Sequence, residues 1–559
     1  MQRIQETEPR PKKGFRSQIF ISIASWLIGT SYGMSMGHSA VLLPHLRAEN
    51  GSLYIEEETG SWIASVYAFA APIGCLVAGV TMDIWGRWKM NIIGDLGMIV
   101  GWILIIFAEN IPMLIVGRVL EGFSRSILAT AIMVLLDEVA EPRYRGFIVC
   151  SVYTCVSIGI MAISSLGALL HWRIASALAC LVSIVTLLAI WVITESPTWY
   201  VRMNRVQEAD KALQWLWGPK KANQAKEELY DLKRRFHPCN SEEEILSKGV
   251  VQERNLKKYL EPRILKPFFI MHVFNGLQAV CGLGILTFYT VDIVSKTRNG
   301  DIEVLDDYSS TVVISVVRVI FVLVSSFLML SLGRRTIAMI SGTSSTISAI
   351  SLGVILLLRE MGSPIHPYTE SYILFILLLI YAGSMSFGFF SLPTIMIGET
   401  QPTHVRGFAC GYFYTMNDLF LGGVVKLYPW ISNTLKIQGL FFMFGISCLV
   451  CTVFVYLFLP ETQGLTLSQI EDYFRKDNVL WITRHKGSQI SVYSIAGPIG
   501  CLFGGLGSDL WGRRTLNVVG ATGTMIGWIL ITFSQNAAML VWGRVFEGFS
   551  RSTTASALT

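Results

Sequence analysis

The sequence predicts an all-α, polytopic membrane protein with twelve transmembrane helices in two sets of six, followed by a partial repeat of the first set. Hydrophobic residues make up 52% of the 559 residues and charged residues only 15%, whereas soluble domains usually carry about 25% charged residues. The apolar residues gather in blocks of about 20 or more, the length at which a helix crosses the hydrocarbon of a bilayer. Because lipid offers backbone amides no hydrogen-bond partner, such blocks form helices.

The apolar blocks fall into two groups that a polar stretch separates. The first block is too long for the core of a signal peptide, so we count it as a helix. The first group lies near residues 18–46, 60–82, 90–108, 112–136, 147–170 and 173–194. The second group lies near residues 267–293, 310–332, 336–358, 370–397, 405–432 and 437–459. We therefore expect six helices on each side of a middle loop.

Lysine and arginine in the short loops predict the orientation, because cytoplasmic loops carry an excess of these residues. They occupy the N-terminal segment and then alternate loops: Arg3, Arg10, Lys12, Lys13, Arg16, Arg87, Lys89, Arg143, Arg145, Arg334, Arg335 and Arg406. The intervening loops are acidic or mixed. We expect both ends of the twelve-helix unit to lie in the cytoplasm. The Asn50-Gly51-Ser52 sequon falls in the first outward loop, which makes Asn50 a candidate glycosylation site.

The predicted organisation has six parts. In the middle loop, apolar residues such as Ala209, Leu213 and Leu216 recur at helical spacing, which favours short amphipathic helices at the cytoplasmic face over a solvated tether. The parts are a cytoplasmic N-terminus (1–17), an N-terminal six-helix bundle (18–194), a cytoplasmic helical loop (195–266), a C-terminal six-helix bundle (267–459), a cytoplasmic tail or linker (460–488) and a partial duplicate of residues 63–133 (489–559).

The C-terminal duplicate is a strong repeat. Residues 491–559 align with residues 65–133 without a gap, and Asp83 to Arg87 return as Asp509 to Arg513. After twelve crossings the chain is cytoplasmic, so the copied helix would place Arg513 outside, against the charge rule. We therefore interpret the tail as a fragment of a paralogous carrier joined to a complete one, by gene fusion or a merged gene model. A protein with fourteen or fifteen helices is the alternative.

A weaker repeat relates the two halves of the carrier. Gly86-Arg87 recurs as Gly333-Arg334, and Glu138 recurs as Glu399. Parallel half-repeats of this kind are typical of carriers that rock two bundles around a central site. Guanidinium groups form bidentate bonds with carboxylates, so ion pairs at these helix ends are candidates for a cytoplasmic gate. The candidate residues are Asp83, Arg87, Glu138, Arg145, Glu195, Arg334, Arg335, Glu399 and Arg406. A role in topology alone is the alternative.

Five motifs follow one another along the chain: Asp83 to Arg87, Glu138 to Gly146, Glu195-Ser196-Pro197, Gly333-Arg334-Arg335 and Pro460 to Gly464. In order and spacing they resemble the motifs of the sugar porter family of the major facilitator superfamily. The resemblance covers about residues 15–475 and is strongest for the insect branch of facilitated trehalose and glucose transporters. It implies two six-helix bundles, alternating access, and cytoplasmic helices between the bundles, here within residues 204–246.

The resemblance also implies a substrate site, where this chain departs from the family. The family's Gln-Gln pair in the seventh helix is Gln278-Ala279 here, and its Gly-Ile-Asn is Gly282-Leu283-Gly284. Two tryptophans of the tenth and eleventh helices are also replaced. Because sugars are held by side-chain hydrogen bonds and aromatic stacking, these losses weaken or redirect the binding of an ordinary hexose. The candidate substrate-binding residues are Gln278, Tyr289, Asn417, Asp418, Tyr153 and Thr394.

The predicted helices carry charges inside the membrane, and each costs at least a few kcal/mol at the bilayer centre. Arg118, Glu121 and Arg125 share one face of the fourth helix at spacings of three and four. Arg118 matches an arginine common in the family, whereas the other two are departures. Either the three form a self-neutralised structural cluster, or Arg125 faces the cavity and favours an anionic or highly polar solute. Asp418 is either a ligand or coupling residue, or a carboxylate paired with a neighbouring helix.

The resemblance bears on energy coupling as well. Proton-driven members of the family carry an Asp in the first helix, whereas this chain has no Asp or Glu between Gly14 and Ala48. We therefore expect facilitative transport (uniport) of a sugar such as a hexose or trehalose, by alternating access, in the plasma membrane. The alternatives are a carrier of the same fold for a different polar or anionic solute, and a non-transporting sensor or scaffold.

Other functional classes lack a sequence signal. The ten cysteines lie mostly inside apolar blocks and show neither metal-ligand spacing nor a disulfide framework, so we expect no metal and no cofactor. No nucleophile–base arrangement or phosphate-binding loop indicates an enzyme. The net charge of +6 is modest, and no basic motif interleaved with aromatic residues indicates nucleic-acid binding. The expected partners are a small-molecule solute and the lipid bilayer, and the sequence does not indicate an oligomeric state.

Overall fold

The computed structural model describes residues 15–48, 53–139, 142–218, 221–236, 262–297, 306–329, 332–362, 366–401 and 406–463, with a few positions beyond them. The chain divides into one compact unit of residues 1–479 and a second of residues 480–559. In the second unit residues 520–526 are helical, and most of the predicted partial duplicate lies outside the described residues. The helices below belong to the first unit.

Six long helices form the N-terminal bundle, as the sequence predicts. They are α1 (Phe15–Ala48), α2 (Glu57–Trp85), α3 (Arg87–Ile106), α4 (Ile111–Val139), α5 (Pro142–Leu169) and α6 (Trp172–Val192). α1 packs on α5 and α6, while α4 packs on α2 and α3. The backbones of α1 and α5 approach closely at Gly33, where an added Cβ would lie 2.0 Å from the carbonyl oxygen of Val156. Glycine at such a crossing lets two membrane helices pack backbone to backbone.

The helices of the C-terminal bundle are interrupted at more points than hydropathy predicts. Its elements are α11 (Pro262–Val280), α12 (Leu283–Phe288), α13 (Thr290–Thr297), α14 (Asp307–Leu328), α15 (Arg334–Glu360), α16 (Pro367–Phe387), α17 (Leu392–Thr400) and α18 (Arg406–Phe458). The span expected at 267–293 is interrupted at Gly282, whose φ of 92° is left-handed and suits glycine. The span expected at 370–397 is divided before α17, which carries Pro393 in its first turn. α18 continues through the last two expected spans and changes direction at Lys436, where φ is 56°.

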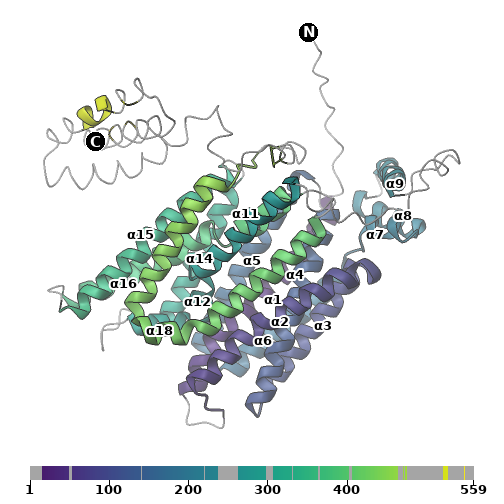
Figure 1. Cartoon of the computed structure of the whole chain (residues 1–559). Helices are drawn as coiled ribbons and strands as arrows, with labels where there is room; N and C mark the ends of the chain where they lie inside the picture. The colour runs from purple at the N-terminus through teal and green to yellow at the C-terminus, as the bar shows by residue number, and fades with distance from the viewer. Residues whose placement is uncertain are drawn as a thin grey trace. The chain divides into compact units, whose positions relative to one another are not determined.

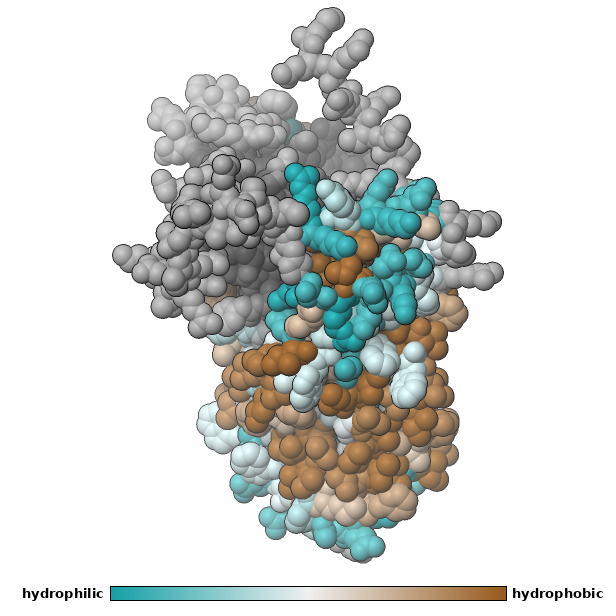
Figure 2. Space-filling view, turned by 90° about the vertical axis from the view of Figure 1, so that its right-hand side faces the viewer, coloured by the Kyte–Doolittle hydropathy of each residue, from teal (hydrophilic) through white to brown (hydrophobic). Residues whose placement is uncertain are grey.

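These elements fit the predicted arrangement of six plus six helices. Among the described residues, ten helices are long and apolar enough to cross a membrane. α18 carries two of the expected spans, and α11 to α13 supply the seventh in pieces. Figure 2 shows a broad hydrophobic band between two hydrophilic zones of the surface. Large apolar side chains such as Leu188 and Trp191 remain 65% and 66% exposed, as on a surface that faces lipid.

The two bundles face each other through two main helix pairs. α18 packs on α2, and α14 packs on α5. Figure 1 shows the N-terminal helices, in purple and blue, beside the C-terminal helices, in teal and green. At the first of these contacts Gly422 lies against the ring of Phe69. The contacts leave a cavity between the remaining inner faces of the bundles.

Three short helices follow the N-terminal bundle: α7 (Pro197–Arg202), α8 (Val206–Trp217) and α9 (Ala222–Phe236). The side chains of Ala209, Leu213 and Leu216 are buried, as expected for amphipathic helices that pack on one another. The hydroxyl of Ser17 donates to the carbonyl oxygen of Leu216 at 2.7 Å, which joins the end of α8 to the beginning of α1. The helical prediction for the middle loop is confirmed over these residues, while residues 237–261 lie outside the described part of the chain.

Candidate functional site

A central cavity lies between the two bundles and encloses about 100 Å³. Its walls come from α1, α2, α4 and α5 of the N-terminal bundle and from α11, α12, α17, α18 and the α16–α17 connection of the C-terminal bundle. Five of the six candidate substrate-binding residues line it together: Tyr153, Gln278, Thr394, Asn417 and Asp418. The volume is below the roughly 300 Å³ at which ligand pockets usually begin, so the cavity is nearly closed in this state.

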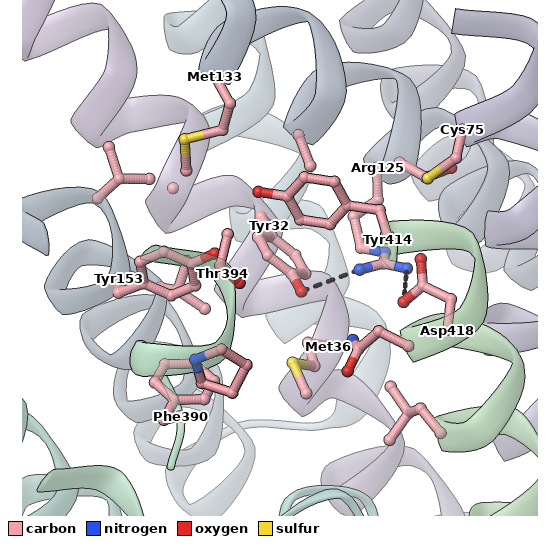
Figure 3. Close-up of a pocket in the computed structure, with 18 of the residues that line it drawn as sticks. Tyr32, Met36, Cys75, Arg125, Met133, Tyr153, Phe390, Thr394, Tyr414 and Asp418 are labelled. Carbon is pink, nitrogen blue, oxygen red and sulfur yellow. Dashed lines mark hydrogen bonds and ion pairs between the residues drawn. The ribbon is translucent and has the colours of Figure 1, made fainter. Parts of the chain in front are cut away.

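An ion pair crosses this cavity from one bundle to the other. Nη2 of Arg125 on α4 lies 2.8 Å from Oδ1 of Asp418 on α18 (Figure 3). Nη1 of Arg125 donates to the hydroxyl of Tyr32 at 2.9 Å, and the guanidinium lies 4.9 Å from the centre of that ring. Arg125 therefore faces the cavity, and Asp418 is paired with a helix of the opposite bundle.

Aromatic and hydroxyl groups occupy another part of the cavity wall. The ring of Tyr153 meets that of Phe390 edge to face, with 5.6 Å between the ring centres. Figure 3 shows Tyr153 beside Thr394. Tyr32, Tyr414 and Met36 complete this region and were not singled out from the sequence. The site thus offers aromatic faces together with hydroxyl, amide and charged groups.

Tyr289 does not line the central cavity. Its ring stacks on that of Tyr428, with 4.3 Å between the centres, and its hydroxyl donates to the carbonyl oxygen of Val425 at 3.4 Å. It borders a second cavity of about 270 Å³, whose walls include Arg47 and Asp292. This cavity lies near the end of the bundles at which α2 begins, so Tyr289 is placed apart from the other candidate residues.

The other intramembrane charges form a separate pair within the N-terminal bundle. Nη1 of Arg118 lies 2.6 Å from Oε2 of Glu121, and both side chains are fully buried. Arg118 also donates to the carbonyl oxygen of Ser35 and the hydroxyl of Ser39, at 3.1 and 2.6 Å. Because this cluster joins α4 to α1, it fits the structural alternative, whereas Arg125 is separate from it.

At the other end of the bundles, Arg87 holds a carboxylate cluster together. Its Nη2 lies 3.1 Å from carboxylate oxygens of both Asp83 and Glu138. The carboxylate of Glu195 accepts the backbone N–H groups of Arg87 and Trp88, each at 2.9 Å, at the beginning of α3. Burial raises the pKa of Glu195, against the opposing effect of these backbone hydrogen bonds.

The C-terminal bundle repeats this cluster. Nη2 of Arg334 lies 3.0 Å from Oε1 of Glu399. The carboxylate of Glu461 accepts the backbone N–H groups of Arg334 and Arg335 at 2.9 and 3.1 Å. Glu461 was not among the candidate gate residues, although the motif from Pro460 to Gly464 contains it. An alignment of the two halves would have shown that Glu461 corresponds to Glu195. The guanidinium of Arg335 turns away and donates to the carbonyl oxygen of Tyr456.

The described members of these clusters pair within one bundle. Arg87, Glu138 and Glu195 all belong to the N-terminal half, and Arg334, Glu399 and Glu461 to the C-terminal half. The side chains of Arg145 and Arg406, like residue Asn50, lie outside the part of the chain that is described. The gate assignment of the described residues therefore stays a prediction.

Contacts between the bundles also gather near the end at which α2 begins, where the sequence offered no candidates. Nζ of Lys426 donates to the hydroxyl of Ser61 at 2.7 Å and lies 3.9 Å from the ring centre of Trp62. On the opposite side of the entrance, Nη1 of Arg47 lies 3.8 Å from Oδ1 of Asp292. These contacts join the two bundles at this end of the molecule. Lysine inside an apolar block was the signal that could have drawn attention to Lys426.

Known proteins of similar sequence share this architecture. The family model described as "Sugar (and other) transporter" matches residues 20–474 and again residues 483–558, the region of the duplicate. The facilitated trehalose transporter Tret1 of Apis mellifera ligustica is 27% identical over 461 residues, which cover 82% of this chain and 88% of that protein. The facilitated glucose transporter member 8 of solute carrier family 2 from Bos taurus is 25% identical over 493 residues, which cover 84% of this chain and 98% of that protein.

Solved structures agree on the fold. The inward open conformation of the xylose transporter XylE from E. coli superposes with a TM-score of 0.63 at 15% identity, over 81% of this chain and 99% of that chain. The proton:xylose symporter XylE bound to 6-bromo-6-deoxy-D-glucose, a major facilitator superfamily protein, gives a TM-score of 0.64 at 16% identity, over 82% and 99% of the two chains. The chain is therefore a multi-pass membrane protein that belongs to the sugar transporter family and has the major facilitator fold.

Proposed function

We propose that this chain is a facilitative carrier that moves a sugar, such as a hexose or trehalose, down its gradient across the plasma membrane. The observation that carries the proposal is the central cavity, which both bundles wall and which gathers Tyr153, Gln278, Thr394 and Asn417. Hydroxyl-rich solutes need such donors and acceptors, because an unpaired polar group in a closed site is costly. The family, and relatives named as facilitated transporters, support the same reading.

The arrangement of contacts supports alternating access. We place the Arg87 and Arg334 clusters on the cytoplasmic side, because basic loops stay in the cytoplasm. The Lys426–Ser61 and Arg47–Asp292 contacts then close the outer end in this state. Because the Arg87 and Arg334 clusters pair within their own bundles, they brace each bundle while it rocks. The outer contacts must break for the cavity to open outward.

The absence of an acid from α1 supports uniport. α1, which carries the proton-binding Asp in proton-driven relatives, has no Asp or Glu here. Among acids described within the spans, Glu121 pairs with Arg118 and Asp418 pairs with Arg125, whereas Asp95 on α3 is buried without a hydrogen-bond partner and does not line the central cavity. A guanidinium partner favours the charged form of a carboxylate while burial favours the protonated form, so the uniport assignment rests on the absence of an acid from α1.

Solute uptake by the purified full-length chain in proteoliposomes tests the proposal. The panel is glucose, trehalose, a polyol and an organic anion, each with and without an imposed proton gradient. We expect saturable sugar uptake whose rate is unchanged by the proton gradient. Uptake that accumulates sugar against its gradient when protons flow inward contradicts uniport. Absence of sugar uptake by protein that is shown to be folded contradicts the sugar assignment.

The presence of Arg125 in the cavity favours one alternative, a carrier of the same fold for an anionic solute. In that case the anion should be taken up faster than glucose, and Arg125→Gln should remove this preference. The pairing of Arg125 with Asp418 weighs against it, because the positive charge already has a partner.

A further inference from the structure

The ion pair between Arg125 and Asp418 has an unusual position in this fold. One residue belongs to each bundle, both line the central cavity, and their side chains are only 4% and 5% exposed. Figure 3 shows the guanidinium reaching across the cavity toward the carboxylate on α18. A solute that enters the cavity therefore meets both charges at once.

Charge balance at this position restricts what the cavity can accept. The two charges cancel, and the other polar groups of the described lining, such as Gln278, Thr394 and Asn417, are neutral. An anion that binds Arg125 would leave Asp418 buried without a partner. A cation that binds Asp418 would likewise leave Arg125 buried without a partner. Breaking a buried pair in this way is strongly unfavourable, and more so within a membrane.

The same pair retains hydrogen-bonding capacity for an uncharged solute. A guanidinium has five N–H donors. Nη1 of Arg125 is bonded to Tyr32 and Nη2 faces Asp418, but Nε has no hydrogen-bond partner among the described residues. A buried donor without a partner costs free energy that a solute hydroxyl recovers. Hydroxyl groups can thus bond to the pair without separating its charges.

We propose that Arg125 and Asp418 act together as the specificity-determining residues of the cavity, by neutralising each other so that ions are rejected and an uncharged polyhydroxy solute is accepted. Without the side chain of Asp418 the cavity should prefer anions, and without that of Arg125 it should prefer cations. The proposal rests on the proposed transport function for the identity of the site, but it concerns binding and is tested apart from turnover.

A second buried pair provides a matched control. Arg118 and Glu121 are also an arginine–carboxylate pair, both lie on α4 as Arg125 does, and both are buried. Their hydrogen bonds, however, are with each other and with α1, and neither residue lines the cavity. Glu121→Gln therefore breaks a buried pair without changing the charge of the site.

The experiment measures binding to the purified full-length chain in detergent, through the shift of the unfolding temperature with ligand concentration. The probes are glucose, glucuronate and 6-amino-6-deoxyglucose at neutral pH, which differ at one carbon and carry no charge, a negative charge and a positive charge. The proteins are wild type, Arg125→Gln, Asp418→Asn, the double variant that combines them, and Glu121→Gln. Proteoliposome uptake of the same probes is measured in parallel.

We expect wild type to bind glucose at least roughly tenfold more tightly than either charged probe, because a mismatch of buried polar groups is costly. Asp418→Asn should reverse the preference toward glucuronate, and Arg125→Gln toward the amino sugar. The double variant should again prefer glucose, since it has lost both charges. Glu121→Gln should lower the unfolding temperature without changing the order of the three affinities. This reversal and recovery would not arise from a role in folding alone.

Three results overturn the proposal. Wild type could bind a charged probe as tightly as glucose, the single variants could lose all three probes to the same extent without a change in preference, or no protein could bind any probe. The last result contradicts the proposed function as well. If wild type binds glucose selectively and the variants reverse the preference, but no protein supports uptake, the charge pairing stands and the transport function fails.

Discussion

Glu195 and Glu461 occupy equivalent positions in the two bundles, and each carboxylate accepts two consecutive backbone N–H groups at the beginning of a membrane helix. Glu195 accepts at 2.9 and 2.9 Å at the start of α3, and Glu461 at 2.9 and 3.1 Å at the start of α15. The first N–H groups of a helix have no partner within it and carry partial positive charge. The two glutamates therefore satisfy the first N–H groups of α3 and α15 and oppose the partial positive charge there.

We expect Glu461→Gln to lower the free energy of unfolding by about 1–2 kcal/mol, because the amide retains one acceptor and loses the negative charge at the helix end. Thermal unfolding of the detergent-solubilised protein measures the change. Glu208→Gln is the control, since Glu208 forms an exposed pair with Arg205 on α8. Exposed pairs contribute about 0–1 kcal/mol, so the control should change little. Equal losses in the two variants would refute the helix-end role of Glu461.

The buried position of Glu195 leads to a pH dependence of stability. Burial raises its pKa above the ordinary value of 4.5, so the folded protein binds this proton more tightly than the unfolded chain does. Ionisation of this carboxyl group therefore lowers the free energy of unfolding as the pH rises from 4.5 through the raised pKa. Glu195→Gln removes the titration. We expect the unfolding temperature of the variant, relative to wild type, to increase as the pH rises over this range. A difference that is independent of pH would contradict the assignment.

Hydropathy and charge were sufficient to predict the two bundles, because an apolar segment in lipid must satisfy its own backbone hydrogen bonds and therefore forms a helix. They could not predict the breaks in α11–α13 and α16–α17, since the apolar composition continues through Gly282 and through the residues before Pro393. These interruptions depend on local backbone geometry. The helices α7 to α9 were predictable because their apolar residues recur at helical spacing.

Five of the six candidate substrate residues meet in the central cavity because the family resemblance supplied their helix faces. Tyr289 does not, since the chain bends at this residue between α12 and α13, and its ring packs on Tyr428. The partnership of Arg125 with Asp418 was left open by the sequence. The two residues lie far apart in the chain, and only the packing of α4 against α18 brings them together.

Lys426 is expected to control opening at the end where α2 begins. Lys426→Met removes a hydrogen bond to Ser61 and a cation–π contact with Trp62, which together are worth about 1 kcal/mol or more. A change of this size shifts the equilibrium between closed and open states by roughly fivefold. A cysteine introduced at Ala40, which is buried and borders the second cavity, should then react faster with a maleimide.

The control for this variant lies on the same helix. Lys436 pairs with Glu360, and both residues belong to the C-terminal bundle, so Lys436→Met leaves the contact between bundles intact. We expect the reactivity of the cysteine at position 40 to remain at the wild-type level in this background. Equal acceleration by Lys426→Met and Lys436→Met would show that loss of a lysine loosens α18 generally, and that Lys426 does not hold the two bundles together.

The crossing of α1 and α5 should tolerate no side chain at Gly33. A Cβ there would lie 2.0 Å from the carbonyl oxygen of Val156, and backbone cannot move aside as a flexible side chain does. We expect Gly33→Ala to lower the free energy of unfolding by about 1–3 kcal/mol, the usual cost of overpacking. Gly79→Ala on α2 is the matched control, because an added Cβ would meet nothing within 4 Å. Since alanine is the better helix former, this control should unfold at the same temperature as wild type or a higher one. If Gly33→Ala is as stable as Gly79→Ala, the two helices can separate at this crossing without penalty, and the close backbone approach at Gly33 does not stabilise the bundle.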